Sequence, residues 1–293
     1  PIRMRAGLRF FLQEAVARKH PFMRNTIMPN LPQTAVILAA GMGIRLRPVV
    51  GIRPKGLLEI DGKPLLGRSI ELLKAHGIRR LHVATGHQAE LLEQELQPYL
   101  EGLEVKFVWN ERYSESGSMH SLYQLRACVQ EDFVLLESDL LYERRALDQL
   151  FAAPQRDVVL ISGKTASGDE VWVYGEPPEA RNAQGRIQAI SKQPRPQYEA
   201  QGELTGLSRI SSELYARMCA FHEAHLQFPS NYHYEECISD VCGVLAVPYL
   251  LDSKLVWTEI DTPEHYERAV GAVWPRILEA DRPPGQESRR ING

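Results

Sequence analysis

Apolar and polar positions follow one another along the chain in a pattern that predicts strands and helices in turn from residue 34 onward. Short runs rich in apolar and β-branched residues predict strands at 34–38, 81–85, 105–109, 133–137 and 158–162. Longer amphipathic stretches predict helices at 65–76, 88–96, 118–129 and 144–151. This alternation predicts an α/β fold in which helices cover both faces of a mostly parallel mixed sheet.

The pattern changes after residue 162. Glycines, prolines and short alternating runs over 163–210 predict a small antiparallel β insertion or lid beside the main sheet. The next predicted elements are helices at 211–224 and 235–245, a strand at 256–260 and a last helix at 262–278 that Pro275 interrupts. We therefore expect one domain over residues 33–280, preceded by an N-terminal extension, 1–32, and followed by a flexible polar tail, 281–293.

Residues 1–32 are basic and carry apolar side chains at partly helical spacing. Two interpretations stay open. A transit peptide would look similar but would contain more serine. The alternative is an extension that lies on the surface of the domain.

Composition and charge exclude several function classes. The 293 residues are 44% hydrophobic and 24% charged, which is ordinary for a globular protein. The net charge of -3 gives no electrostatic reason to expect a nucleic-acid partner. No apolar run approaches the roughly 20 residues that cross a bilayer, so we expect no membrane insertion. A homodimer stays open.

The four cysteines, Cys128, Cys219, Cys237 and Cys242, form no CxxC pair, and no histidine cluster completes a zinc site. They fit buried thiols of a reducing compartment, which favours a cytoplasmic location.

The segment after the first predicted strand reads Leu38-Ala39-Ala40-Gly41-Met42-Gly43-Ile44-Arg45. Glycine lets the backbone approach a ligand closely, and amide groups there can hold phosphate oxygens. Arg45 can fork onto phosphate oxygens, and Lys55 can act as a compact point charge. Displacement at an α-phosphate needs such cations for the phosphate charge and the leaving pyrophosphate. The segment predicts a phosphate-binding loop; the alternative is a solvated basic turn.

Two commoner glycine loops do not fit. The dinucleotide-binding motif needs a third glycine at position 46, where the chain has Leu46. The Walker motif needs Gly-Lys-Ser/Thr after an earlier glycine. Gly163-Lys164-Thr165 lacks that glycine because Val158 stands in its place.

Residues 38–48, together with Pro54-Lys55-Gly56-Leu57-Leu58 and Gly62-Lys63-Pro64-Leu65-Leu66, resemble the signature of the sugar-phosphate nucleotidyltransferase superfamily. The sequence departs from it at Val49-Val50, where the family usually has Leu-Thr, so a loop position differs but no charge is lost. The resemblance covers roughly residues 34–275. It implies a Rossmann-like fold of the nucleotide-diphospho-sugar transferase type, with nucleotide bound at Leu38–Gly43 and with Arg45 and Lys55 as catalytic cations.

Two carboxylates follow predicted strands, in Leu135-Leu136-Glu137-Ser138-Asp139 and in Glu259-Ile260-Asp261. Ligands in open α/β sheets bind outside the carboxyl ends of strands, and Mg²⁺ shares its oxygen ligands with phosphates. Each aspartate taken singly fits a helix cap equally well, and Asp261 precedes a good helix start. The resemblance implies that Asp139 and Asp261 bind Mg²⁺.

The segment from Asn110 to Leu122 is similar to the smaller cytidylyltransferase branch of that superfamily. The resemblance implies CTP as the nucleotide, with Thr85, Gly86, Gly117 and Ser118 near the base; ordinary turns are the alternative. Residues 162–173 and 202–206 look most like phosphonoalkyl cytidylyltransferases, which implies 2-aminoethylphosphonate as the acceptor. Phosphocholine and sugar or polyol phosphates remain alternatives.

Acceptor-binding residues are expected on two segments. Lys192 resembles a lysine that faces the acceptor phosphoryl group, although a surface strand residue would look the same. An aminoalkyl acceptor needs a carboxylate or an aromatic face for its ammonium group. Tyr234 and Glu235 offer both, and Asp240 follows about a turn and a half later if this segment is helical. The alternative there is a polar helix start.

Together these residues suggest an in-line displacement in which the acceptor oxygen attacks the α-phosphorus of CTP. No protein general base is needed, because the acceptor is already ionised near neutral pH. Two other classes remain: an oxidoreductase that binds a dinucleotide, which the missing third glycine disfavours, and a nucleotide-sensing protein without catalysis. The intact set of Arg45, Lys55, Asp139 and Asp261 disfavours the second class.

Overall fold

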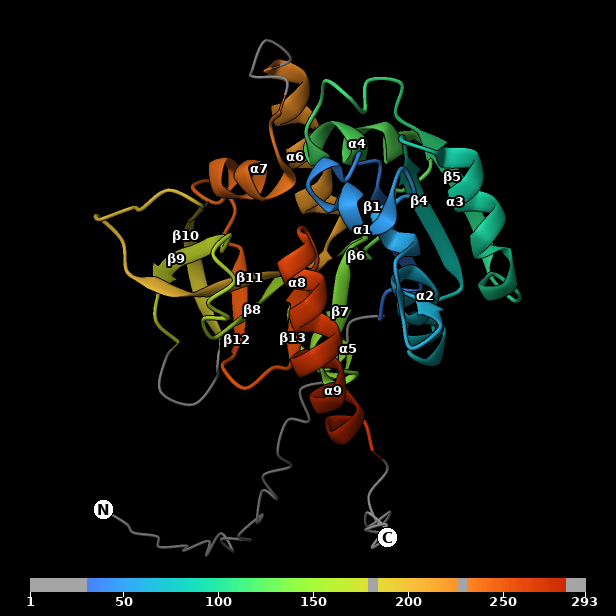
Figure 1. The fold of residues 1–293 in the computed structure, drawn as a ribbon. Coiled ribbons are helices and arrows are strands. Elements are labelled where there is room, and N and C mark those ends of the chain that lie inside the picture. The colour runs from blue at the N-terminus through green and yellow to red at the C-terminus, as the bar shows by residue number, and fades with distance from the viewer. Residues whose placement is uncertain (1–30, 179–183, 226–230, 283–293) are drawn as a thin grey trace, which may run out of the picture.

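The computed structural model describes residues 31–178, 184–225 and 231–282 of the chain (Figure 1). The predicted extension, 1–32, and the predicted tail, 281–293, therefore lie almost entirely outside the described residues.

A nine-stranded mixed sheet forms the centre of the fold, in the order β5-β4-β1-β6-β11-β8-β12-β10-β9. Its strands are β1 (Thr34–Ala39), β4 (Arg80–Thr85), β5 (Glu104–Trp109), β6 (Phe133–Glu137), β8 (Val158–Ser162), β9 (Trp172–Glu176), β10 (Gln184–Ser191), β11 (Ala200–Ile210) and β12 (Pro248–Asp252). The strands β5, β4, β1 and β6 are parallel to one another, as expected for the βαβ half of the chain.

Helices cover both faces of this sheet (Figure 1). Alternate residues of β1 point to opposite sides, so Val36 and Leu38 pack in one core and Ala35 and Ile37 in the other. The first core contains side chains of α4 (Ser118–Gln124), α6 (Ser212–Ala224) and α7 (Tyr234–Val241). The second contains side chains of α2 (Leu65–Ala75), α3 (Ala89–Leu96) and α5 (Arg145–Ala152). The fold is the predicted Rossmann-like α/β type.

A third, smaller core lies beside the sheet and contains side chains of α1 (Arg47–Val50), β2 (Glu59–Ile60), β7 (Leu140–Tyr142), α8 (Pro263–Arg268) and α9 (Trp274–Ala280). Two further short strands pair with this group: β3 (Lys63–Pro64) with β2, and β13 (Trp257–Glu259) with β7. The strands β7 and β13 pair antiparallel, and the amide of Ile260 donates to the carbonyl of Asp139 over 3.0 Å. This pairing brings two segments more than a hundred residues apart to the same end of the sheet.

The strands of 163–210 are antiparallel, as predicted, but they do not form a sheet beside the main one. β11 lies inside the nine-stranded sheet, between β6 and β8, and pairs antiparallel with both. Because β11 is 11 residues long, its two halves pair with different strands. The later half pairs with β6, and the earlier half pairs with β9. The predicted insertion is therefore continuous with the main sheet.

Other boundaries differ for local reasons. The helix predicted over 118–129 ends at Gln124 and tightens into a 3₁₀ turn at Leu125–Ala127. The helix predicted over 235–245 ends at Val241, and β12, which the pattern did not reveal, follows it. In the last helix, a π turn at Ala269–Val273 precedes Pro275, which has no N–H for the carbonyl four residues earlier.

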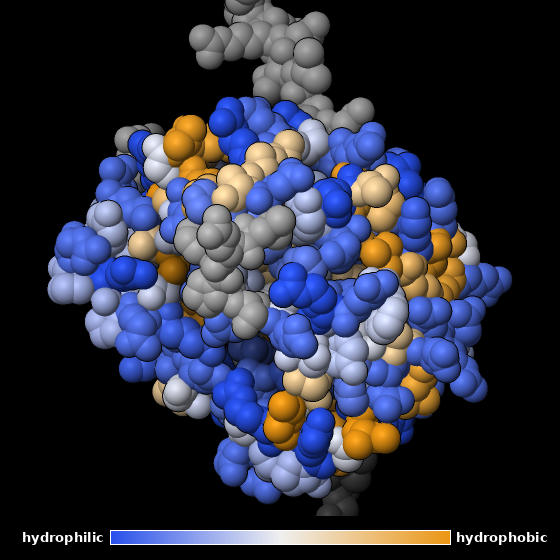
Figure 2. All heavy atoms as spheres, turned by 90° about the horizontal axis from the view of Figure 1, so that it is seen from above, coloured by the Kyte–Doolittle hydropathy of each residue, from blue (hydrophilic) through white to orange (hydrophobic). Residues whose placement is uncertain are grey.

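Within the described ranges, no helix is both long enough and apolar enough to cross a membrane. On the face seen in Figure 2, hydrophilic residues predominate, and the hydrophobic ones lie in small separate groups. Scattered groups of this kind are ordinary on folded proteins and do not by themselves identify a partner.

Candidate active site

A cavity of about 370 Å³ lies where the carboxyl ends of β1 and β6 meet β11 and the end of β13. Parallel α/β sheets bind their ligands at such strand ends. The predicted site residues that line the cavity are Leu38, Ala39, Ala40, Gly41, Arg45, Lys55, Gly117, Ser118, Asp139, Lys192, Glu235 and Asp261. The predicted residues outside its lining are Met42, Gly43, Thr85, Gly86, Tyr234 and Asp240.

The glycine loop begins where β1 ends and brings Lys55 into the cavity. Gly43 has a positive φ of 56°, which disfavours other residues. A Cβ atom at this position would also lie 2.8 Å from Cγ of Lys55. Gly43 thus shapes the loop and leaves room for the side chain of Lys55, although it does not line the cavity itself.

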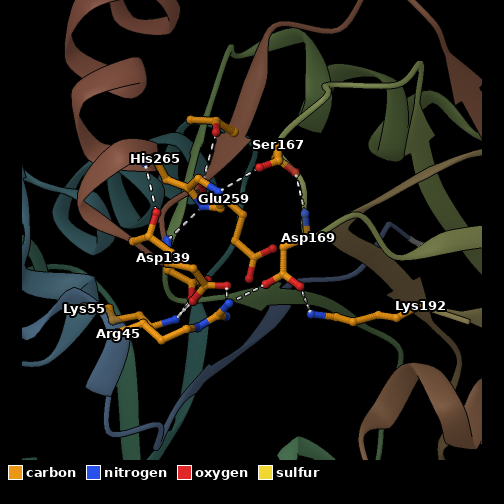
Figure 3. Close-up of polar contacts among 11 residues, drawn as sticks. Arg45, Lys55, Asp139, Ser167, Asp169, Lys192, Glu259 and His265 are labelled. Carbon is orange, nitrogen blue, oxygen red and sulfur yellow. Dashed lines mark hydrogen bonds and ion pairs between the residues drawn. The ribbon is translucent and has the colours of Figure 1, made fainter.

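Cations that line the cavity alternate with carboxylates in one series of contacts (Figure 3). Nζ of Lys55 lies 2.8 Å from Oδ2 of Asp139 and also pairs with Asp261. Nη2 of Arg45 donates to Oδ2 of Asp261 over 2.8 Å, and Nη1 donates to Oδ2 of Asp169 over 2.8 Å. Nζ of Lys192 completes the series, 2.6 Å from Oδ1 of Asp169. The ion pairs therefore form one continuous series from Asp139 to Lys192.

At the buried end of this series, the ion pairs shift the pKa values of Lys55 and Asp261. Burial disfavours the charge on Lys55, but Asp139 and Asp261 outweigh it and raise the pKa of the lysine above its usual value. Burial also opposes ionisation of Asp261, but Lys55 beside it lowers the pKa of that carboxyl to about 2. Both groups are therefore charged at neutral pH.

Three carboxylates face one another next to these cations. Ligand oxygens of Glu137, Asp139 and Glu259 all lie within 4.8 Å of one another. Burial, followed by the charge of Asp139, raises the pKa of Glu137 to about 8 and also raises the pKa of Glu259. Asp139 is only 7% exposed, and its Oδ1 has no hydrogen-bond partner in the described part of the chain. A hard divalent cation such as Mg²⁺, which prefers oxygen ligands, fits this donor set.

Comparisons with known proteins identify the family of the chain. Residues 35–184, half of the chain, match the model of the MobA-like NTP transferase domain. The chain belongs to this family.

Curated relatives of this MobA-like domain include several enzymes that make CMP-linked products or carry cytidylyltransferase in their names. The chain is 31% identical over 132 residues to CMP-5'-(3-aminopropyl)phosphonate synthase of Streptomyces rubellomurinus, a match that covers 45% of this chain and 21% of that protein. It is 29% identical over 242 residues to the bifunctional IPC transferase and DIPP synthase of Thermococcus kodakarensis, covering 82% of this chain and 50% of that protein. The chain thus spans at most half the length of these two relatives.

Solved structures share the fold. The inositol-1-phosphate CTP transferase from T. maritima has a TM-score of 0.69 at 24% identity and covers 86% of this chain and 99% of its own. CTP:phosphocholine cytidylyltransferase from Streptococcus pneumoniae has a TM-score of 0.62 at 22% identity, covering 80% of this chain and 96% of its own. The likeness extends well beyond the matched residues 35–184.

The three residues of α7 that were predicted to bind the acceptor have different positions. Glu235 lines the cavity. Tyr234 is buried and contacts the site through two residues of the cavity lining: its hydroxyl donates to Oε1 of Glu137 over 2.7 Å, and its amide donates to Oγ of Ser118 over 3.1 Å. Asp240 is exposed and accepts from the hydroxyl of Tyr232 over 2.7 Å. Five residues turn a helix by about 140° beyond a full turn, so Asp240 points away from Glu235, and we leave it out of the site.

Thr85 and Gly86 lie behind the cavity lining, next to Ala39 and Ala40. Thr85 is fully buried, and a Cβ on Gly86 would come 2.6 Å from the carbonyl oxygen of Ala40. Gly117, in contrast, lines the cavity next to Ser118, where α4 begins. Its position is equally tight, because a Cβ would come 2.2 Å from the carbonyl oxygen of Tyr232.

The sequence interpretation overlooked Glu137, Glu259 and Asp169. A signal for the first two was available, since each strand end carries Glu-x-Asp, at Glu137-Ser138-Asp139 and at Glu259-Ile260-Asp261. Side chains two residues apart in extended backbone share a face, so both carboxylates of each pair could have been assigned to the site. No comparable pattern singled out Asp169, whose role depends on its position in the fold.

Proposed function

We propose that the chain is a Mg²⁺-dependent cytidylyltransferase that joins the CMP part of CTP to a small phosphonate, with 2-aminoethylphosphonate as the leading acceptor. One observation carries the reaction type: the facing carboxylates Glu137, Asp139 and Glu259 lie beside Lys55 and Arg45 at the end of a glycine loop. This arrangement suits a nucleoside triphosphate with its metal ion. The choice of CTP and a phosphonate draws on the Streptomyces relative.

In the proposed reaction, an ionised oxygen of the acceptor attacks the α-phosphorus of CTP. The bond to the β-phosphate breaks on the opposite side, and pyrophosphate leaves. Lys55 and Arg45 stabilise the charge on the transferring and leaving phosphates, since both can present their N–H groups to the cavity. When bound by Glu137, Asp139 and Glu259, Mg²⁺ would neutralise part of the phosphate charge.

The acceptor side of the cavity supports a zwitterionic substrate. Lys192 provides a cation for the phosphonate, and Glu235 provides a carboxylate for an ammonium group. Both side chains line the same cavity, Lys192 from the residue after β10 and Glu235 from α7. We therefore expect a short aminoalkyl chain to contact both.

A second candidate acceptor is a polyol phosphate. It is favoured by the match to the Thermococcus protein over 82% of this chain and by the fold of the inositol-1-phosphate CTP transferase. A polyol would use hydroxyl contacts and would gain little from the negative charge of Glu235.

A pyrophosphate-release screen tests these proposals. It crosses CTP, UTP, ATP and GTP with 2-aminoethylphosphonate, 2-hydroxyethylphosphonate, phosphocholine, inositol 1-phosphate and glucose 1-phosphate. We expect CTP with 2-aminoethylphosphonate to give the highest kcat/KM. Highest activity with inositol 1-phosphate would select the second acceptor. Release that is absent with every pair, or that prefers UTP and glucose 1-phosphate, would contradict the cytidylyltransferase proposal.

A further inference from the structure

Asp169 lies on the segment before β9 and contacts two cations that line the cavity (Figure 3). Its Oδ2 accepts from Nη1 of Arg45 and its Oδ1 accepts from Nζ of Lys192. Burial opposes ionisation of this carboxyl, but the hydrogen bonds from Lys192 and Arg45 outweigh it and lower its pKa. A single ionised side chain thus joins a cation next to the glycine loop to a cation on the acceptor side.

The segment that carries Asp169 is held in place by other contacts. The amide and hydroxyl of Thr165 donate to Glu203 on β11 over 2.7 and 2.9 Å. Two side chains of α8 also contact the segment: Nη1 of Arg268 donates to the carbonyl of Thr165, and Nε2 of His265 lies 3.2 Å from the carbonyl of Ser167. The loop therefore does not need the ion pairs of Asp169 to stay where it is.

The two cations, in contrast, are long and exposed. The side chains of Arg45 and Lys192 are 55% and 51% exposed, whereas that of Asp169 is 23% exposed. Lysine and arginine side chains carry about 2 kcal/mol of rotamer entropy, so an exposed one adopts many positions unless a partner fixes it. A carboxylate on an anchored loop can fix both, and it also screens their mutual repulsion.

We propose that Asp169 is a positioning residue of the transfer reaction, which holds Arg45 and Lys192 side by side so that the two anionic substrates meet. This inference rests on the proposed function, because the reaction brings an anionic acceptor into contact with a triphosphate. Two anions approach each other readily only if their cations are already close. Each cation keeps further N–H groups for its substrate, since Asp169 uses one donor of each.

Steady-state kinetics of Asp169→Asn test the proposal. With CTP and 2-aminoethylphosphonate, we expect kcat/KM for the acceptor to fall by roughly tenfold to a hundredfold, the size typical of misplaced binding groups. The KM of CTP should change less, because Arg45 retains Asp261. Asp169→Glu should recover part of the loss. Asp148→Asn, which removes an exposed carboxylate paired with His76 and Arg144 outside the cavity, is the matched control.

A double-mutant cycle separates positioning from a general structural role. If Asp169 acts through Lys192, then Asp169→Asn should have little further effect on acceptor kcat/KM in a Lys192→Ala background. Fully additive losses would overturn the proposal. An acceptor KM that falls in Asp169→Asn would also overturn it, since the carboxylate would then compete with the acceptor.

A failure of the proposed function can be distinguished from a failure of the proposed role of Asp169. If the wild type released no pyrophosphate in the screen, calorimetric titration with methylphosphonate in the presence of Mg²⁺ and CTP would still test Asp169. Weaker methylphosphonate binding by Asp169→Asn than by Asp148→Asn would support its positioning role, and equal or tighter binding would overturn it.

Discussion

The two ends of the cavity are built differently. At the proposed nucleotide end, Lys55, Asp139 and Asp261 have side chains 18%, 10% and 5% exposed, and the ends of β6 and β13 hold the two carboxylates. At the proposed acceptor end, Lys192 is 51% exposed and receives its partner Asp169 from a loop. Buried charges on core strands tolerate few substitutes, whereas loop residues can change without loss of the fold. The comparison suggests that the nucleotide end determines the reaction type and the acceptor end determines the substrate.

The largest effect is expected at the nucleotide end. Lys55→Ala or Asp139→Ala should lower pyrophosphate release by about a thousandfold, because each removes a charge that the transferring phosphate or its metal ion needs. The measurement is kcat with saturating CTP and acceptor. Circular dichroism and thermal unfolding provide the control, since each change also leaves a buried partner charge without its counter-ion. Near-normal turnover in both variants would contradict the assignment of this end.

A smaller and more selective effect is expected at the acceptor end. Lys192→Ala should raise the KM of the acceptor by roughly tenfold, the cost of one charge-assisted hydrogen bond, and leave the KM of CTP within about twofold. Initial rates over a grid of both substrates measure this. Parallel increases in both KM values would show that the two ends are not separate.

The smallest effect concerns stability and pH. The pKa of Glu137 is raised to about 8 in the folded chain, above its ordinary value of 4.5. Protonated Glu137 therefore favours the folded state below the unfolded pKa, and this contribution is lost as pH rises through 8. Without Mg²⁺, we expect Tm to fall by a few degrees between pH 6 and 9, and Glu137→Gln should flatten the decline.

Mg²⁺ should also oppose this decline, because the metal ion binds the ionised carboxylates. The control is Glu104→Gln, which removes a carboxylate from an exposed position at the start of β5. A wild-type Tm that is as high at pH 9 as at pH 6 in the absence of Mg²⁺ would contradict the predicted charge repulsion among Glu137, Asp139 and Glu259.

The parallel half of the fold could be predicted because its strands and helices have strong local patterns. The strands at 34–38 and 133–137 were predicted within one residue of β1 and β6, and the helix at 65–76 within one residue of α2. β12 and the central position of β11 could not be predicted in this way. Strand pairing depends on residues distant in sequence, and a short strand after a helix has little pattern of its own.

The sequence by itself determined the α/β class, the glycine loop and the identity of its cations, because each depends on neighbouring residues. It also contained both Glu-x-Asp pairs. Only the tertiary structure decided that Glu137 and Glu259 face Asp139, that Asp240 points away, and that Asp169 joins Arg45 to Lys192. Such contacts depend on distances between elements far apart in the chain, and only the packing of β6, β13 and the segment before β9 sets those distances.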